Sequence, residues 1–190
     1  MEDRIAISRL KQGQLSAVEP LVKRYQVQAV HAAYAILQDK ATAEDVTQTA
    51  FVKVVERIHQ FDESRPFAPW FFRIVVNDAV KTAKRKKRNV SLDEQPDEMT
   101  THLAALLADP APQPEQWLEE KQVREHILKA IRSLPPEQRA VIVMRYFLEM
   151  SEADMVSEMD RPLSTIKWWL RDARKRLRNL IGPYHAEDES

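Results

Sequence analysis

Residues 151–178 read SEADMVSEMDRPLSTIKWWLRDARKRLR, and this stretch decides the fold of the second half of the chain. Ser151 and Asp154 have the spacing of a capping box, in which two side chains satisfy the first free amides of a helix. The pattern predicts a short helix that begins here and ends at about Met159. Asp160–Pro162 then breaks the helix, because proline lacks a backbone donor and clashes with the preceding turn.

A second helix follows this break and carries most of the basic residues of the stretch. Ser164 or Thr165 is expected to cap it, and it is expected to run to about Ile181. A short helix, a tight turn and a basic second helix form the helix-turn-helix arrangement, in which the second helix enters the major groove of DNA. Its first residues then contact bases, while later basic residues hold phosphates. The expected groove-facing residues are Ser164, Thr165, Lys167, Trp168 and Arg171, and the expected phosphate contacts are Arg174, Lys175 and Arg178.

The formal net charge of the chain is zero, but its charges are segregated along the sequence. Residues 81–88 hold six basic residues and no acid, and residues 161–178 hold seven basic residues and one acid. Between them, residues 89–120 hold eight acids and no Lys or Arg. Ordinary solvated helix faces would mix the two signs. The segregation therefore predicts two surfaces that bind a polyanion, joined by a segment that does not.

The composition indicates an all-α, cytoplasmic protein. The 190 residues include two glycines and no cysteine, which favours helices over strands and excludes disulfides and thiol chemistry. The first residues lack the apolar run of a signal peptide, and no apolar run approaches the ~20 residues of a membrane span. The five histidines lack metal-ligand spacing, and no nucleophile–base set or phosphate-binding loop is present. We therefore expect no enzymatic activity, no cofactor, no bound metal and no membrane insertion.

Apolar residues with helical spacing predict three long helices in the first half, at residues 17–38, 43–60 and 70–88. Thr42, with Asp45 three residues later, is expected to cap the second of these helices. Residues 61–69 contain two prolines and are expected to form a loop. The third helix begins with apolar residues and ends in the basic cluster, so it joins a buried end to a charged end.

Proline and acid content divide the chain into two helical domains. Residues 89–114 contain four prolines and few large apolar side chains, so we expect a flexible linker there. The second half, residues 115–181, is expected to form four helices, of which the last two are the helix-turn-helix pair. The expected division is a first domain at 1–88, the linker at 89–114, a second domain at 115–184 and an acidic tail at 185–190.

Several segments form an ordered set along the chain. In the second half they are Leu134–Ala140 (LPPEQRA), Val141–Phe147 (VIVMRYF), Met150–Val156 (MSEADMV), Pro162–Lys167 (PLSTIK) and Arg171–Leu177 (RDARKRL). In order and spacing they resemble region four of the extracytoplasmic-function (ECF) sigma factors. In the first half, Ala43–Val46 (AEDV) with Gln48 and Phe51 is similar to region 2.2 of that family, and Phe61–Trp70, Phe72–Ile74 and Asn77 are similar to regions 2.3 and 2.4.

The resemblance implies a non-enzymatic subunit that brings bacterial RNA polymerase to particular promoters and helps to open them. In this family, region four binds the minus-thirty-five element, region 2.2 docks on the clamp helices of the β′ subunit, and regions 2.3 and 2.4 melt and read the minus-ten element. The implied partners are promoter DNA and the polymerase core, through the β′ clamp helices and the β flap; an anti-sigma factor is left open. The implied polymerase-binding residues are Asp45, Gln48 and Thr49.

The implied minus-ten residues lie in the loop and in the helix after it. They are Phe61, Arg65, Phe67, Asn77, Lys81, Lys84 and Arg85. Aromatic rings in a loop stiffened by proline can stack on unpaired bases, at about 1–3 kcal/mol per base, and the basic helix can hold the backbone nearby. Trp70 and Phe71 are expected to belong to the core instead.

Three sites differ from the usual family pattern. Ser164 stands where the family often has glycine, Trp168 and Trp169 where it commonly has serine and arginine, and Thr49 where it usually has glutamate. The main alternative is a two-domain helix-turn-helix regulator that binds an operator without polymerase. It accounts for the second half but leaves the resemblance of residues 43–77 as coincidence.

Overall fold

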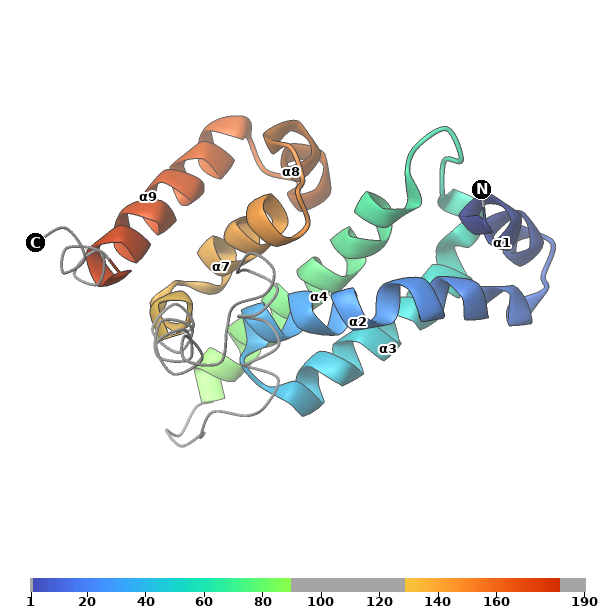
Figure 1. The fold of residues 1–190 in the computed structure, drawn as a ribbon, viewed down its shortest axis with the longest axis horizontal. Coiled ribbons are helices and arrows are strands. Elements are labelled where there is room, and N and C mark those ends of the chain that lie inside the picture. The colour runs from blue at the N-terminus through green and yellow to red at the C-terminus, as the bar shows by residue number, and fades with distance from the viewer. Residues whose placement is uncertain (1, 90–128, 182–190) are drawn as a thin grey trace, which may run out of the picture.

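The structure is a computed structural model that describes residues 2–89 and 129–181. The expected all-α fold is confirmed: the described residues contain no strand, and none of their helices is long and apolar enough to cross a membrane (Figure 1). The elements are α1 (Glu2–Lys11), η1 (Leu15–Val18), α2 (Glu19–Leu37), α3 (Lys40–Arg57), η2 (Ile58–Gln60), α4 (Phe67–Asn89), α7 (Pro136–Ile142), the π-helical turn η4 (Val143–Phe147), α8 (Glu152–Met159) and α9 (Leu163–Ile181). The expected linker beyond residue 89 and the expected acidic tail lie outside the described residues.

Helices α2, α3 and α4 pack into a bundle around an aromatic core. The buried face of α2 includes the small residues Ala29, Ala32 and Ala33. Small side chains let the neighbouring helices approach closely, as dense packing requires. Phe71 of α4 is fully buried, and its ring stacks on Phe51 of α3 with centroids 4.6 Å apart. The expectation that Phe71 belongs to the core is confirmed, and Trp70 packs against the same core while partly exposed.

Helix α1 lies before the three helices whose ranges the sequence predicted. Ala6, Ile7 and Leu10 are its buried residues, and it packs against α2. Asp3 accepts a hydrogen bond from the Tyr25 hydroxyl at 2.6 Å, and burial together with this bond raises the pKa of Tyr25 to about 12. A helix of 10 residues is marginal in isolation, so α1 depends on these tertiary contacts.

Helix α3 begins earlier than expected, at Lys40, and its N-cap is Asp39 rather than Thr42. The Asp39 carboxylate accepts a hydrogen bond from the Thr42 amide at 2.7 Å. Gln38, with a φ of 60°, ends α2 immediately before this cap, so a single turn joins the two helices. Lys86 of α4 also donates to Asp39, at 2.7 Å, and ties the cap to the third helix of the bundle.

We predict that the Asp39 cap contributes to stability over a defined range of acid pH. Burial raises the pKa of this carboxyl, but hydrogen bonds from Lys86 and Thr42 and the charge of Lys86 outweigh burial and lower the pKa from 3.8 to about 2. A lowered pKa in the folded state means that this contribution is present above about pH 4 and is lost as the pH falls toward 2. Urea unfolding should show a loss of stability between these pH values that is smaller in Asp39→Asn. An equal pH dependence in both proteins would contradict this assignment.

The predicted capping box in the second half is confirmed. The Ser151 side chain accepts a hydrogen bond from the Asp154 amide, and the Asp154 carboxylate accepts one from the Ser151 amide. Helix α8 begins at Glu152 and ends where Asp160 takes a φ of 51°. The tight turn of the helix-turn-helix therefore uses a left-handed aspartate, a residue that tolerates this conformation better than most.

Helix α9 begins at Leu163, so the expectation that Ser164 or Thr165 caps it is wrong. Both lie inside the first turn. The Pro162 carbonyl accepts the amides of Thr165 and Ile166, at 2.9 and 3.1 Å. Pro162 precedes the helix because its fixed φ and missing amide suit the position just before the first turn.

The two halves of the chain pack against each other. Helices α7 and α8 lie against α4, and α7 also contacts α2 (Figure 1). An ion pair joins Lys84 of α4 to Glu137 of α7, and Arg132 donates to the Gln38 side chain at 2.8 Å. The sequence left open whether the halves are apart or together, and in this structure they are together.

Candidate nucleic-acid interface

Helix α9 has one buried face and one basic face. Ile166, Leu170 and Ala173 are buried with the spacing of a single helix face. The exposed residues include Ser164, Lys167, Trp168, Arg171, Arg174, Lys175 and Arg178, and Thr165 is partly exposed. All residues expected to contact duplex DNA therefore lie on one helix, away from its buried side.

Acidic charge does not offset this basic face. Asp172, the acid of α9, accepts hydrogen bonds from Gln138 of α7 at 2.7 Å and from Arg176 at 2.9 Å. These bonds, with the one from Gln138 contributing most, lower the pKa of Asp172. Lys167 lies 3.9 Å from Glu152 of α8, an exposed pair that contributes little. The face keeps an excess of positive charge, which suits DNA phosphates.

The two adjacent tryptophans of α9 have different surroundings. Trp169 packs against the core, whereas Trp168 is 50% exposed within the basic face. Trp168 has Lys167 beside it and Arg171 one turn later. An apolar ring in such a face suits the methyl group of thymine, which is the apolar feature of the major groove.

A second basic face runs along α4. Arg65, Lys81, Lys84 and Arg85 are exposed, and Asn77 is partly buried. Arg73 was not predicted, although its spacing of four and eight residues from Asn77 and Lys81 places it on the same side of the helix. We call Arg65, Arg73, Asn77, Lys81, Lys84 and Arg85 together the α4 face.

The rings of Phe61 and Phe67 do not lie open to solvent. They are 4% and 5% exposed, and they pack edge to face with centroids 5.7 Å apart. Trp70 lies 5.1 Å from Phe61, and Phe71 lies 5.9 Å from Phe67. The expectation of two free stacking faces is therefore wrong for this structure. Burying such rings removes a large apolar area from water, and this gain outweighs exposure in a loop.

A small pocket of about 310 Å³ lies between α1 and the loop at residues 61–66. Its lining includes Tyr25, Phe61, Ser64, Arg65, Pro66 and Phe67. Lys11 of α1 holds the loop in place, because it donates to the Phe61 carbonyl at 2.9 Å and pairs with Glu63 at 2.8 Å. The pocket thus combines buried aromatic walls with polar groups at its rim.

Helix α3 presents an exposed face made of the residues expected to bind polymerase. Asp45, Gln48 and Thr49 are all exposed and lie within one turn of each other. Val52 follows one turn later and is 57% exposed, although it is apolar. The sequence pattern did not single out Val52, but the same helical spacing could have found it.

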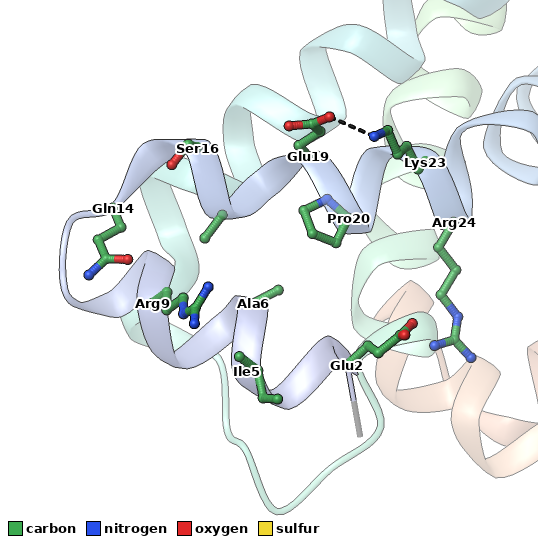
Figure 2. A pocket seen from close by; sticks show the side chains of 11 residues that line it. Glu2, Ile5, Ala6, Arg9, Gln14, Ser16, Glu19, Pro20, Lys23 and Arg24 are labelled. Carbon is green, nitrogen blue, oxygen red and sulfur yellow. Dashed lines mark ion pairs between the residues drawn. The ribbon is translucent and has the colours of Figure 1, made fainter.

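A larger groove of about 810 Å³ lies between α1 and the start of α2 (Figure 2). Arg9, Lys23 and Arg24 contribute cations to its lining, and Glu19 forms an ion pair with Lys23 at 2.7 Å. None of the predicted DNA or polymerase contacts lines it. The groove is therefore separate from the α3, α4 and α9 faces.

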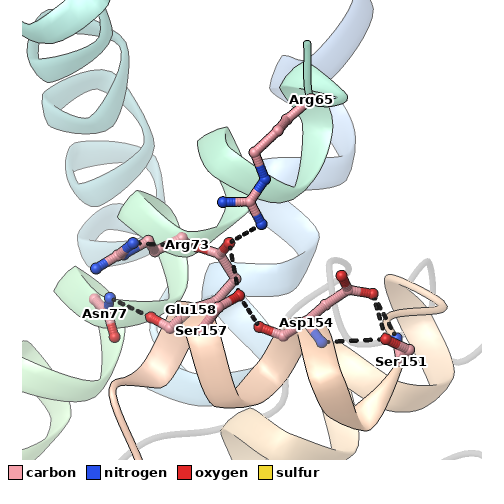
Figure 3. Close-up of polar contacts among 7 residues, drawn as sticks. All are labelled: Arg65, Arg73, Asn77, Ser151, Asp154, Ser157 and Glu158. Carbon is pink, nitrogen blue, oxygen red and sulfur yellow. Dashed lines mark hydrogen bonds and ion pairs between the residues drawn. The ribbon is translucent and has the colours of Figure 1, made fainter. Parts of the chain in front are cut away.

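In this structure, α8 covers part of the α4 face (Figure 3). Glu158 of α8 is 4% exposed and points at two arginines. Its carboxylate oxygens lie 4.0 Å from Arg65 Nη2 and 3.5 Å from Arg73 Nη1. The Asn77 side-chain amide donates to the Glu158 carbonyl at 3.2 Å. Three residues of the α4 face are therefore in contact with one residue of the helix-turn-helix.

Comparison with known proteins gives a consistent result over both halves. The model of sigma-70 region 2 matches residues 21–89, and the model of sigma-70 region 4 matches residues 124–177. The ECF RNA polymerase sigma factor SigW of Bacillus subtilis (strain 168) is 29% identical over 177 residues, which cover 92% of this chain and 94% of SigW. The ECF RNA polymerase sigma-E factor of Escherichia coli (strain K12) is 26% identical over 186 residues, which cover 96% of each chain.

Two solved structures share the fold. CnrH, in complex with the cytosolic domain of CnrY, aligns with a TM-score of 0.64 at 22% identity, over 96% of this chain and 99% of that one. The sigma factor RpoE of Bartonella quintana, in complex with the anti-sigma factor NepR, aligns with a TM-score of 0.66 at 18% identity, over 88% of this chain and 98% of that one. Both likenesses concern the fold, and both extend over most of the chain.

Proposed function

The chain belongs to the ECF sigma factors of the sigma-70 family, and we propose that it binds core RNA polymerase, brings it to particular promoters and helps to melt them. The observation that carries this proposal is the ordered pair of matches to regions 2 and 4 within one chain. Each half also presents an exposed face with the chemistry that its region requires.

The α9 face is proposed to bind the minus-thirty-five element. Lys167 and Arg171 stand near the start of the helix, where they would reach base edges, and Arg174, Lys175 and Arg178 stand further along, where they would contact phosphates. Trp168 would contribute an apolar contact beside Arg171. Because the net positive charge of this face is not offset, its binding should depend strongly on salt.

The α3 face is proposed to dock on the β′ clamp helices. Asp45, Gln48 and Thr49 offer polar contacts, and the exposed side chain of Val52 offers an apolar one. An exposed apolar residue beside polar ones is a common centre for a protein interface. The β flap is proposed as a second polymerase contact, with the region 4 half.

The α4 face and the pocket beside it are proposed to act on the minus-ten element. Arg65, Lys81, Lys84 and Arg85 would hold the backbone of the unpaired strand, and Asn77 would hydrogen-bond a base edge. The pocket of about 310 Å³ between α1 and the loop has the aromatic and polar lining that an extruded base requires. Phe61 and Phe67 would then serve as buried walls of this pocket.

The proposal describes a binding protein. We propose that the chain has no catalytic activity of its own and that it works in the cytoplasm, where promoters and polymerase meet. CnrH and RpoE were each solved with a second protein, and the latter partner is named an anti-sigma factor. We therefore propose an anti-sigma protein as a further partner of this chain.

Run-off transcription with purified core polymerase tests the proposal directly. The chain should direct transcription from at least one fragment of a genomic DNA library on which core polymerase alone is silent. A helix-turn-helix regulator that acts without polymerase would bind DNA but leave the core silent. That result would overturn the proposed function and restore the alternative.

We predict that Thr49→Glu binds core polymerase more tightly than Thr49→Ala. The family usually carries a glutamate at this position, and phosphorylation of threonine would add a charge of about −1.5 to −2. A titration of fluorescently labelled core measures both affinities. Gln26→Glu, which adds the same charge at an exposed site on α2, should bind like the unaltered chain. Equal affinities for the two Thr49 variants would dispose of the idea.

A further inference from the structure

We propose that Lys11 of α1 is a positioning residue for the pocket between α1 and the loop at residues 61–66. It holds the loop in the conformation that keeps the pocket formed before DNA binds, and it does not contact the DNA itself. The proposal rests on the proposed role of this pocket in holding a base of the minus-ten element. It gives a role in promoter opening to a helix that precedes the region 2 match, which begins at residue 21.

The loop is anchored at its two ends, by the buried rings of Phe61 and Phe67, while residues 62–66 between them are exposed. Within the loop, the Asp62 carboxylate accepts a hydrogen bond from the Ser64 amide at 2.9 Å, and the Asp62 carbonyl accepts one from the Arg65 amide at 3.1 Å. These bonds shape the turn but do not attach it to a neighbouring element. The loop lies beside α1, so α1 can supply that attachment (Figure 1).

Lys11 attaches the first part of the loop to α1 at two points. Its ammonium group donates to the Phe61 carbonyl at 2.9 Å and pairs with the Glu63 carboxylate at 2.8 Å. The Lys11 side chain is 25% exposed, so both contacts are partly shielded from salt. Hydrogen bonds from a charged donor are stronger than neutral ones. One ammonium group bound to two acceptors in a short segment therefore restricts the conformation of that segment.

Helix α1 is itself fixed to the first domain. Ile7 is buried, and Asp3 accepts a hydrogen bond from the Tyr25 hydroxyl at 2.6 Å. The Tyr25 ring in turn lies 5.5 Å from the Phe67 ring by centroid distance. Asp3, Ile7 and Tyr25 all line the pocket. The same helix thus forms one wall of the pocket and holds the loop that forms the other.

The ion pair also reduces an unfavourable charge at the rim of the pocket. Glu63 and Arg65 both line the pocket, whereas Lys11 is not among the described residues that line it. An unpaired Glu63 carboxylate would repel a DNA phosphate held by Arg65. Pairing with Lys11 directs this carboxylate toward α1 and neutralises it. A loop that is already ordered and neutralised costs the DNA strand less free energy to bind.

Lys11→Met tests the proposal, because it removes both contacts and keeps an unbranched side chain. Arg9→Met is the matched control: it removes the same charge from the same helix, at a residue whose side chain lies in the groove between α1 and α2. Lys11→Arg is the rescue variant, since a guanidinium group can donate to both acceptors.

The affinity measurement uses the holoenzyme, which is core polymerase with the whole chain, and a promoter fragment recovered by run-off transcription. The minus-ten element of the fragment is single-stranded, and each of its nucleotides is replaced in turn by an abasic one. Hydrogen exchange of the amides of residues 62–65, followed by mass spectrometry, measures the order of the loop in the chain alone.

The unaltered chain should lose affinity about tenfold at one abasic position, where the missing base is the one that occupies the pocket. Lys11→Met should bind the complete strand about tenfold more weakly and lose nothing further at that position, because both changes remove the same interaction. The slope of log affinity against log salt should stay unchanged in Lys11→Met, since Lys11 is paired with Glu63 and neutralises no phosphate. The loop amides should exchange about fivefold faster in Lys11→Met. Arg9→Met and Lys11→Arg should behave like the unaltered chain in all these measurements.

Three outcomes would overturn the proposal. An equal loss of affinity in Lys11→Met on every template would mean a general loss of structure, and a salt slope reduced by about one would mean a direct phosphate contact. Unchanged hydrogen exchange would mean that Lys11 does not hold the loop. Faster exchange in a chain that directs no run-off transcription would instead contradict the proposed function, while the attachment of the loop by Lys11 would stand.

Discussion

Replacing Phe67 by alanine is expected to lower the free energy of unfolding by about 3–5 kcal/mol, the usual cost of removing a buried phenylalanine. The ring is 5% exposed and lies within 6 Å of Tyr25, Phe61, Trp70 and Phe71 by centroid distance. Thermal or urea unfolding followed by circular dichroism measures the change. The loss should appear in the chain alone, without polymerase or DNA.

Tyr146→Ala is the matched control for this variant. Tyr146 is 52% exposed, so its removal should change the free energy of unfolding by less than about 0.5 kcal/mol. If Phe67→Ala instead kept full stability and lost only promoter opening, its ring would be a stacking surface after all. The burial of Phe67 in the free chain would then not persist in the complex with DNA.

Replacing Arg171 by alanine is expected to reduce the use of promoters that depend on the upstream element by about 5- to 150-fold, the cost of one base contact of about 1–3 kcal/mol. Lys167→Ala should act in the same direction. Both side chains are exposed near the start of α9. Run-off transcription on promoters with intact and altered upstream elements measures the effect, which should vanish on the altered ones.

Two other arginines of α9 provide controls. Arg174→Ala should weaken binding to all duplexes alike and reduce the slope of log affinity against log salt by about one. Arg176 is held by Asp172 at 2.9 Å, so Arg176→Ala should leave promoter choice unchanged. If Arg171→Ala behaves like Arg176→Ala, the proposed orientation of α9 on DNA is wrong.

The sequence alone was sufficient for features that depend on a few neighbouring residues. The Ser151–Asp154 capping box, the break before α9 and the periodicity of α2, α3 and α4 are local, and the structure confirms that these helices form. Charge segregation and the order of motifs also belong to the sequence, and they led to the family. The predicted starts of α3 and α9 were less accurate. Asp39 caps α3, and the Pro162 carbonyl accepts the first amide hydrogen bonds of α9; both residues precede the caps that were expected.

Only the tertiary structure determined which of the predicted site residues are exposed and which are buried or in contact with other parts of the chain. Phe61 and Phe67 have the same sequence signature whether they face a base or the core, and only the packing of Trp70 and Phe71 around them selects the core. The contact between Asn77 and Glu158 joins residues 81 positions apart. The sequence around Glu158 does not indicate that this residue contacts α4. Helix propensity and local charge depend on residues close together in the sequence. Whether a side chain is buried, or already in contact with another residue, depends on distant parts of the chain that pack against it.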